Sequence, residues 1–478
     1  MSKKNLAILS SLISLSLTTI VSQVAAQTYP SCSPSGTSAT NLVVCSASYL
    51  GGSSEDQGSA VEVGSDYSVV FGGTIIGNNF GRTPVNLKAG NSTTSGGNGA
   101  IVRTSPNGQQ ILSVTRLGNS IDDLDVNRSQ STIAVVGDFG LALLSSQANQ
   151  VLWSKYISTG GGALASSGRR VAVGTNGEVA ALFNKKITIF NQQGTQLGQF
   201  TPSGSYVEDI AVDSASGSVI VTGTSQKDGG GCSQLQVAWI RSYSYTGTLK
   251  WKNYDWTREQ AYSPVNNCAD TRGVRVAIGR DNLLYFAGQS AGGNTIFRYN
   301  PRNLSSSAPN VKYDQYNDAY NTKSNWITYY SRLAPATGTI QKGQLALTRL
   351  GDGRGNSIEP RAITADENGN VYISGTSAAY IANRRDMKLS ISGQPLGTYN
   401  GYEGFMLVVP KEFTSRKVWT AWTGTNSTSV FSTFAGVSAA KGIAAIMGTS
   451  NGKMITVSPI QGNNAGVKDA FFSVFPNF

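Results

Sequence analysis

Short apolar runs separated by turn residues recur along the chain and predict β-strands throughout. The two most similar copies are residues 210–225 and residues 363–377. Each copy has an apolar strand, a tight turn rich in Asp, Asn, Ser and Gly, a second strand with β-branched residues, and a closing Gly-Thr-Ser. β-Branched residues favour strands, and Asn, Asp and Gly favour hairpin turns. The pattern therefore predicts a repeated β-hairpin.

Weaker copies of this pattern divide the chain into seven units of about four strands each. The predicted units cover residues 49–117, 119–157, 162–200, 207–256, 271–350, 358–424 and 430–475. Repeated four-stranded units are typical of radial architectures, above all the β-propeller. A series of two-sheet sandwiches or a β-helix is the alternative that the pattern leaves open.

Two motifs resemble those of a known repeat family. Residues 49–56 read Tyr-Leu-Gly-Gly-Ser-Ser-Glu-Asp, and variants of this link occur at residues 115–120 and 348–351. Together with the Val-x-Ile/Val-Thr/Ser-Gly-Thr-Ser strand, they resemble the bacterial SBBP β-propeller repeat family. The resemblance extends over most of residues 42–478. It implies a propeller fold and an extracellular setting, and it assigns no catalytic residues.

The two ends of the chain predict how such a propeller would close. The seventh unit stops after its third strand, whereas residues 42–50 form a spare strand before the first unit. Pairing this strand with residues 470–474 would protect two exposed strand edges. We therefore expect an all-β, seven-bladed β-propeller of four-stranded antiparallel blades over residues 42–478, closed by the N-terminal strand and preceded by a segment at residues 27–41.

The first 26 residues predict a secretory signal peptide. Lys3 and Lys4 precede an apolar run, and Ala25 and Ala26 offer a small-residue cleavage site before Gln27. An uncleaved membrane anchor is the alternative, but the run is rich in Ser and Thr. No later stretch is apolar enough to span a membrane. We expect a secreted protein, either extracellular or in the periplasm and cell envelope.

Composition narrows the possible functions. The chain has 38 Lys and Arg against 27 Asp and Glu, and no histidine at all. The absence of histidine excludes Ser-His-Asp and Cys-His catalysis and His-ligated zinc. The positive charge favours acidic partners, but no basic run with interleaved aromatic residues indicates a nucleic acid. We predict no cofactor, and leave calcium open because residues 352–357 contain several potential oxygen ligands.

Four cysteines in an oxidising compartment predict two disulfides. Three pairings are possible, and proximity in sequence favours Cys32–Cys45 and Cys232–Cys268. A metal site is the alternative, although no Cys-x-x-Cys spacing is present. We assign no metal ligands.

The longest loops are expected on one face of the molecule. In a four-stranded meander, the loop from the second to the third strand emerges on the same side as the links between units. Residues 74–99, 225–234, 289–325 and 378–404 have this position, so this long-loop face is the expected binding face. Its candidate ligand-binding side chains, aromatic or cationic, are Tyr313, Tyr316, Tyr320, Arg384 and Arg385.

Acidic residues recur close to the start of the innermost strands. The candidates are Asp56, Asp123, Asp209, Asp270 and Glu359. Such residues would lie near the mouth of a central channel and could bind a cation or a polyhydroxylated ligand. The structural alternative is that each carboxylate accepts backbone N–H groups from the next unit, or pairs with Arg272 or Arg361.

These observations favour a secreted binding or scaffold protein without enzymatic activity. It would recognise an extracellular polysaccharide, an envelope component or a protein on its long-loop face, as a monomer. The alternative is a glycan-active hydrolase that uses two mouth carboxylates as acid and base or nucleophile. Carboxylates tied to backbone groups would favour binding, and an open pair across a pocket would favour catalysis.

Overall fold

The computed structural model describes residues 31–127, 129–157, 168–228, 234–262, 268–293, 295–313, 326–349, 355–378, 387–397, 402–425 and 431–478. The predicted signal peptide lies outside these residues. So do Tyr316, Tyr320, Arg384, Arg385, Cys232 and residues 352–354 of the possible calcium loop. The predictions made on them remain predictions.

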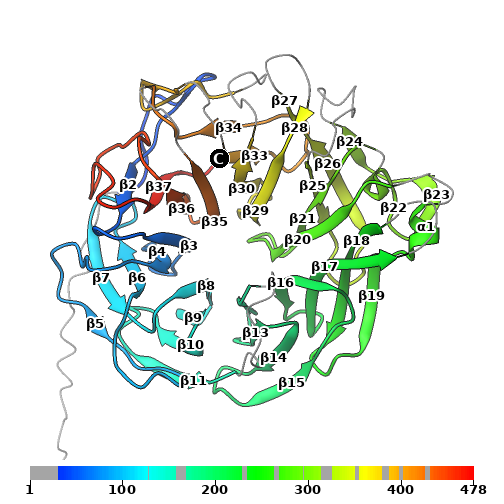
Figure 1. Cartoon of the computed structure of the whole chain (residues 1–478), viewed down its shortest axis with the longest axis horizontal. Helices are drawn as coiled ribbons and strands as arrows, with labels where there is room; N and C mark the ends of the chain where they lie inside the picture. The colour runs from blue at the N-terminus through cyan, green and yellow to red at the C-terminus, as the bar shows by residue number, and fades with distance from the viewer. Residues whose placement is uncertain are drawn as a thin grey trace, which may run out of the picture.

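The described residues are almost entirely β-structure, and their larger sheets number seven, each with four or five strands in a meander. Each sheet coincides with one predicted unit. Their first strands are β3 (Gln57–Val63), β8 (Ile121–Val126), β12 (Arg170–Val173), β16 (Tyr206–Asp213), β20 (Thr271–Ile278), β29 (Ile358–Ala365) and β35 (Ser432–Ala440). Figure 1 shows the sheets following one another around a common centre, with these first strands, where labelled, nearest to it.

The second strands are buried along most of their length. They are β4 (Val69–Thr74), β9 (Thr132–Gly137), β13 (Val179–Phe183), β17 (Ser218–Asp228), β21 (Leu284–Ser290), β30 (Val371–Ser377) and β36 (Ile443–Ser450). Side chains on both faces of β9, β30 and β36 are buried. A strand buried on both faces needs a continuous apolar sequence, which explains why the segment that forms β30 was part of one of the clearest copies of the repeat pattern.

The third and fourth strands complete each sheet outwards. The third strands are β6 (Gly99–Thr104), β10 (Gly140–Ser145), β14 (Lys186–Phe190), β18 (Gln234–Ser244), β25 (Ile327–Leu333), β33 (Glu403–Val409) and β37 (Asp469–Pro476). The fourth strands are β7 (Ile111–Arg116), β11 (Val151–Lys155), β15 (Gln196–Phe200), β19 (Leu249–Tyr254), β26 (Ile340–Ala346), β34 (Val418–Ala421) and β2 (Ser46–Leu50). Short strands β5 (Val85–Asn86) and β24 (Val311–Tyr313) pair with β7 and β26.

The hydrophobic core lies between the sheets rather than at the centre of the molecule. Each apolar cluster combines residues of two successive sheets, as where Val70 and Ile101 of the first sheet meet Val135 of the second. The seventh sheet packs in the same way on the first, through Met447, Phe472 and Phe71. The last sheet in the chain is therefore a direct neighbour of the first.

The N-terminal strand joins the seventh sheet, as predicted. β2 pairs antiparallel with β37, from Ser46 opposite Val474 to Leu50 opposite Ala470. The predicted strand 42–50 is interrupted, however. Its start forms β1 (Asn41–Leu42), which pairs with β31 (Ser390–Ile391) from the loop of the sixth sheet. The N-terminal segment thus contacts two neighbouring sheets.

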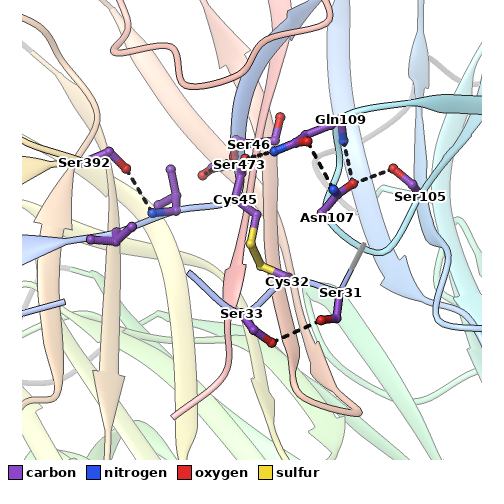
Figure 2. Close-up of a disulfide and its surroundings, with 12 residues drawn as sticks. Ser31, Cys32, Ser33, Cys45, Ser46, Ser105, Asn107, Gln109, Ser392 and Ser473 are labelled. Atoms are coloured by element: carbon purple, nitrogen blue, oxygen red, sulfur yellow. Dashed lines mark hydrogen bonds between the residues drawn. A yellow bond between two sulfur atoms is a disulfide. The ribbon is translucent and has the colours of Figure 1, made fainter. Parts of the chain in front are cut away.

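The predicted disulfide Cys32–Cys45 is present and holds the start of this segment (Figure 2). The Cys45 N–H donates to the Val474 carbonyl, and the Gln109 side-chain amide donates to the Cys45 carbonyl at 2.9 Å. The disulfide therefore lies where the first and seventh sheets meet. Cys268 is also disulfide-bonded, but its predicted partner lies outside the described residues.

One predicted loop is shorter than expected. Residues 225–234 were assigned to a long loop, whereas β17 continues to Asp228 and β18 begins at Gln234. The two strands stay paired out to Asp228 and Gln234. The Gly-Thr-Ser at residues 223–225 was interpreted as the end of a strand. Here β17 continues beyond it, and its residues stay paired with those of β18.

Candidate binding site at the channel mouth

The seven first strands together line a central channel. A cavity of about 140 Å³ lies among them, and each of the seven contributes to its wall. The sequence could predict that such a channel exists, because the repeat count and the meander place one strand of every unit nearest the centre. It could not predict which side chains point into the channel.

A β-bulge recurs at the same level in six of these seven strands. In each case one residue of the first strand has no partner in the second strand. The skipped residues are Ser59, Asp122, Glu208, Val274, Arg361 and Ala435. A bulge bends the strand and redirects side chains, and bulges are frequent beside functional sites. Four of the six skipped residues line the channel or its mouth: Ser59, Asp122, Arg361 and Ala435.

A glycine of the second strand stands opposite each bulge, and in three sheets it is the glycine of a Gly-Thr-Ser motif. At Gly375, a Cβ atom would overlap the carbonyl oxygen of Glu359, just before the bulge at Arg361. The equivalent glycines in the other bulged sheets are Gly73, Gly137, Gly223, Gly288 and Gly448. Only glycine permits this close approach of two backbones. A glycine at this position of the second strand therefore marks a bulge that shapes the channel.

The residues that follow the bulges form a ring with two different halves. Asp123, Asp209 and Arg275 carry charge, whereas Ala60, Ala362 and Gly436 are small. The pairing of the first two strands of the third sheet contains no bulge, and its Arg170 takes the corresponding place. The correspondence is visible in the hydrogen bonds, because Asp123 and Asp209 accept the N–H of the residue after Arg170 and of the residue after Arg275, respectively.

The predicted acidic residues are mostly tied to the backbone of a neighbouring segment. Asp123 accepts the Val171 N–H at 3.1 Å, and Asp209 accepts the Val276 N–H at 3.0 Å. Burial raises the pKa of Asp123 to about 7, although Arg170 nearby acts in the opposite direction. Burial also raises the pKa of Asp209. Both carboxyls line the channel and tie one sheet to the next.

The remaining acidic candidates separate into two groups. Asp56 accepts the N–H groups of Gly52 and Ile76, and Asp270 accepts that of Gln236. Neither lines a channel cavity. Glu359 does lie at the mouth, where it pairs with Arg361 at 3.0 Å. The structure thus brings Asp123, Asp209 and Glu359 to the channel and leaves Asp56 and Asp270 outside it.

A wider cavity of about 770 Å³ opens at the end of the channel where the first strands begin. This is the side of the long loops. Its lining includes the four arginines Arg169, Arg170, Arg275 and Arg361 and the two acids Asp122 and Glu359. Tyr402 and Phe431, which are 51% and 40% exposed, lie in the same wall. We call this cavity the mouth.

Several mouth residues had no usable signal in the sequence. Arg169 and Arg170 lie in the most degenerate unit, and Phe431 precedes a strand without any motif. The glycine opposite each bulge is the signal that could have located the mouth, since it marks the level at which the first strand turns its side chains. Of the predicted loop residues, Tyr313 lies in β24 and is placed only by its backbone.

The part of the chain that the structure describes offers no cluster of three metal-ligating side chains. Nor does any helix in it reach the length and apolarity needed to cross a membrane. These two findings concern the described residues alone. The possible calcium site at residues 352–357 remains a prediction.

One family model matches part of the chain. Residues 347–381, which include β29 and β30, match the family model SBBP, described as a beta-propeller repeat. A solved structure that resembles the chain is the C-terminal WD40 domain of Sif2, with 9% identity, a TM-score of 0.42, and coverage of 88% of this chain and 82% of that one. No curated protein matches.

The class of protein is thus an all-β scaffold of β-propeller type, built from repeated antiparallel sheets. More particularly, the chain carries an SBBP β-propeller repeat at residues 347–381, as the motifs predicted.

Proposed function

We propose that this chain is a secreted, seven-bladed β-propeller that binds an extracellular polysaccharide at the mouth of its channel, without catalysing a reaction. The seven sheets are then the blades, and β2 closes the ring by completing the last one. The packing of the seventh sheet on the first supports this closure. The signal-like N-terminus supports export.

The observation that carries the binding function is the mouth itself. It is a wide cavity on the long-loop face, with two exposed aromatic side chains and the hydroxyls of Ser59, Thr376 and Thr433 in its wall. Sugars expose hydroxyl groups at their edges and C–H groups on their faces. A wall of polar groups beside flat aromatic faces is suited to both.

The state of the carboxylates favours binding over hydrolysis. A glycosidase needs two carboxyl groups that face each other across the scissile bond. Asp123 and Asp209 instead accept backbone N–H groups, and Asp122 and Glu359 pair with Arg169 and Arg361. Carboxylates that are engaged in this way are suited to holding the scaffold and contacting a ligand, and less suited to transferring a proton.

Binding is tested by a glycan array with the mature protein, with and without calcium, followed by Tyr402→Ala and Phe431→Ala variants. Loss of each aromatic ring should weaken binding by about 1–3 kcal/mol, on the scale known for bases stacked on aromatic side chains. Tyr67→Ala is the matched control, because Tyr67 is also 51% exposed but lies on the opposite face. An array without any bound glycan, or equal losses in all three variants, would contradict the proposal.

Export is tested separately. The N-terminal sequence of protein recovered outside the cytoplasm should begin at Gln27. Membrane-bound protein whose N-terminal sequence still begins at Met1 would indicate the uncleaved anchor instead.

A further inference from the structure

The mouth has two chemically different sides. On the side of the first and seventh sheets, its wall contains Ser59, Thr74, Thr433 and Ala435, and no charged residue of these two sheets takes part. On the other side lie the four arginines. Tyr402 and Phe431 stand at the uncharged side, where the Phe431 N–H donates to the Asn451 side chain at 2.7 Å and fixes the backbone.

The positive charge on the arginine side is only partly neutralised at the mouth. Arg169 pairs with Asp122, and Arg361 pairs with Glu359 at 3.0 Å. Arg170 and Arg275 are turned towards the channel from the third and fifth sheets, and Asp209 lies near both, 4.0 Å from the Arg170 Nε. Because Asp123 and Asp209 already accept backbone N–H groups, the two guanidinium groups retain donors for an added anion.

Arg170 retains unused hydrogen-bonding capacity. Its nearest carboxylate is that of Asp209, at 4.0 Å from Nε, which is too far for a hydrogen bond. The buried Nε atom has no hydrogen-bond partner in the described structure. A buried donor without a partner is costly, and a bound ligand atom removes that cost.

Arg275 is oriented by the neighbouring sheet. Its Nε donates to the Arg361 carbonyl, and one terminal nitrogen donates to the Val274 carbonyl at 2.7 Å. Burial lowers the pKa of Arg275 to about 10, and the like charge of Arg170 acts in the same direction. The side chain is therefore held in place, remains charged at neutral pH, and shares its surroundings with a second cation.

We propose that Arg170 and Arg275 form an oxyanion subsite for an acidic saccharide, with the sugar ring lying towards Tyr402 and Phe431. The ligand class is a sugar that carries a carboxylate, sulfate or phosphate group. The two sides of the mouth match the two ends of such a molecule, since the hydroxyl and aromatic wall faces the neutral ring and the arginine wall faces the charged substituent. This inference rests on the proposed function for the sugar, but not for the anion.

The test measures binding of small probes by calorimetry and ligand-observed NMR. The probes are methyl glucuronide, glucose 6-sulfate, glucose 6-phosphate and the neutral methyl glucoside. We expect the three acidic probes, or one of them, to bind more tightly than the glucoside, and the ranking identifies the anion. Arg170→Gln should weaken the preferred acidic probe roughly 10- to 100-fold, the range expected for loss of a charged hydrogen bond, and should leave the glucoside unchanged.

Two further variants control for charge and folding. Lys411→Gln removes one positive charge from an exposed side chain on the opposite face, and should leave all affinities unchanged. Arg170→Lys keeps the charge but loses the planar fork, so its affinity should lie between those of the wild type and Arg170→Gln. Thermal midpoints show whether each variant is folded, and Arg170→Lys provides the comparison if Arg170→Gln is not.

The outcomes separate the two proposals. Equal binding of glucuronide and glucoside, both weakened by Tyr402→Ala and neither by Arg170→Gln, would overturn the oxyanion subsite and leave polysaccharide binding standing. Glucuronate binding that depends on Arg170, together with an empty glycan array, would support the subsite and overturn the polysaccharide function. Failure of all four probes to bind at millimolar concentration would overturn the subsite.

Discussion

The third sheet meets the central channel in a different way from the other six. In the six, a glycine of the second strand faces a bulge in the first strand, and the bulge turns a side chain. In the third sheet, β12 pairs with β13 from Arg170 opposite Leu182, and Phe183, the next residue of β13, stands where the others have glycine. Its first strand is also held by the preceding sheet, because Asp123 and Asp125 accept the N–H groups of Val171 and Val173.

This comparison shows that glycine and bulge occur together. In the third sheet, where Phe183 replaces the glycine, the ladder between the first two strands ends at Arg170 and Leu182 and contains no bulge. The third sheet then brings two consecutive arginines, Arg169 and Arg170, to the mouth. The most degenerate repeat of the sequence is thus also the one that contributes the densest positive charge.

The largest expected effect comes from filling the space opposite a bulge. Gly375→Ala places a Cβ atom on the carbonyl of Glu359 and should destabilise the fold by about 3 kcal/mol, as overpacking a rigid site does. Gly462→Ala is the control, because a Cβ there meets nothing closer than the Pro459 ring at 3.8 Å. Urea unfolding of both variants measures the difference. Equal urea midpoints for the two variants would show that the bulge does not require glycine at position 375, and would contradict the comparison.

The next effect concerns the seventh sheet, which borrows its outer strand from the N-terminus. Replacing Cys32 and Cys45 by Ser should lower stability by about 3 kcal/mol if the loop closed by the disulfide is otherwise free. The intervening separation is 13 residues. The oxidised wild type and its reduced form provide the internal reference. If the double variant melts with the oxidised wild type, the backbone pairing of β2 with β37 suffices to hold the segment.

A smaller, pH-dependent effect tests the carboxylate that clamps the third sheet. Burial raises the pKa of Asp123 from its ordinary value of 3.8 to about 7 in the folded protein. Its contribution to stability is therefore complete at the lowest pH and is lost as pH rises towards 7. Asp123→Asn should gain on the wild type by on the order of 2 kcal/mol between pH 4 and pH 8. Parallel pH profiles for the two proteins would show that Asp123 titrates normally.

The sequence predicted the sheets well and the mouth poorly, for a physical reason. A strand that is buried on both faces, such as β30, has a continuous apolar run that can be recognised in the sequence. The pairing of β2 with β37 followed from a spare strand and a missing one. The direction of a side chain at a bulge depends on backbone contacts between two strands. The identity of the bulged residue does not reveal these contacts. Ala435 and Arg361 therefore share a position although their chemistry differs.

The cysteines and the acidic residues show the same difference between what local sequence predicts and what tertiary packing decides. Cys32–Cys45 followed from proximity in sequence and is present. The acidic candidates were identified by type, but only the structure separates Asp56, which holds a loop, from Glu359, which lies at the mouth. Local spacing can identify which residues recur, and tertiary packing decides which of them face the mouth.

The strand exchange between the chain ends has a consequence for biogenesis. Ser473 donates to the Ser46 carbonyl although the two residues lie 427 positions apart in sequence. During synthesis, residues 46–50 lack their partner strand until β37 has been made. Contacts between such distant residues slow folding, and strand edges left open during that interval are prone to aggregate. The synthesis of β37 thus ends the period in which β2 lacks its partner strand.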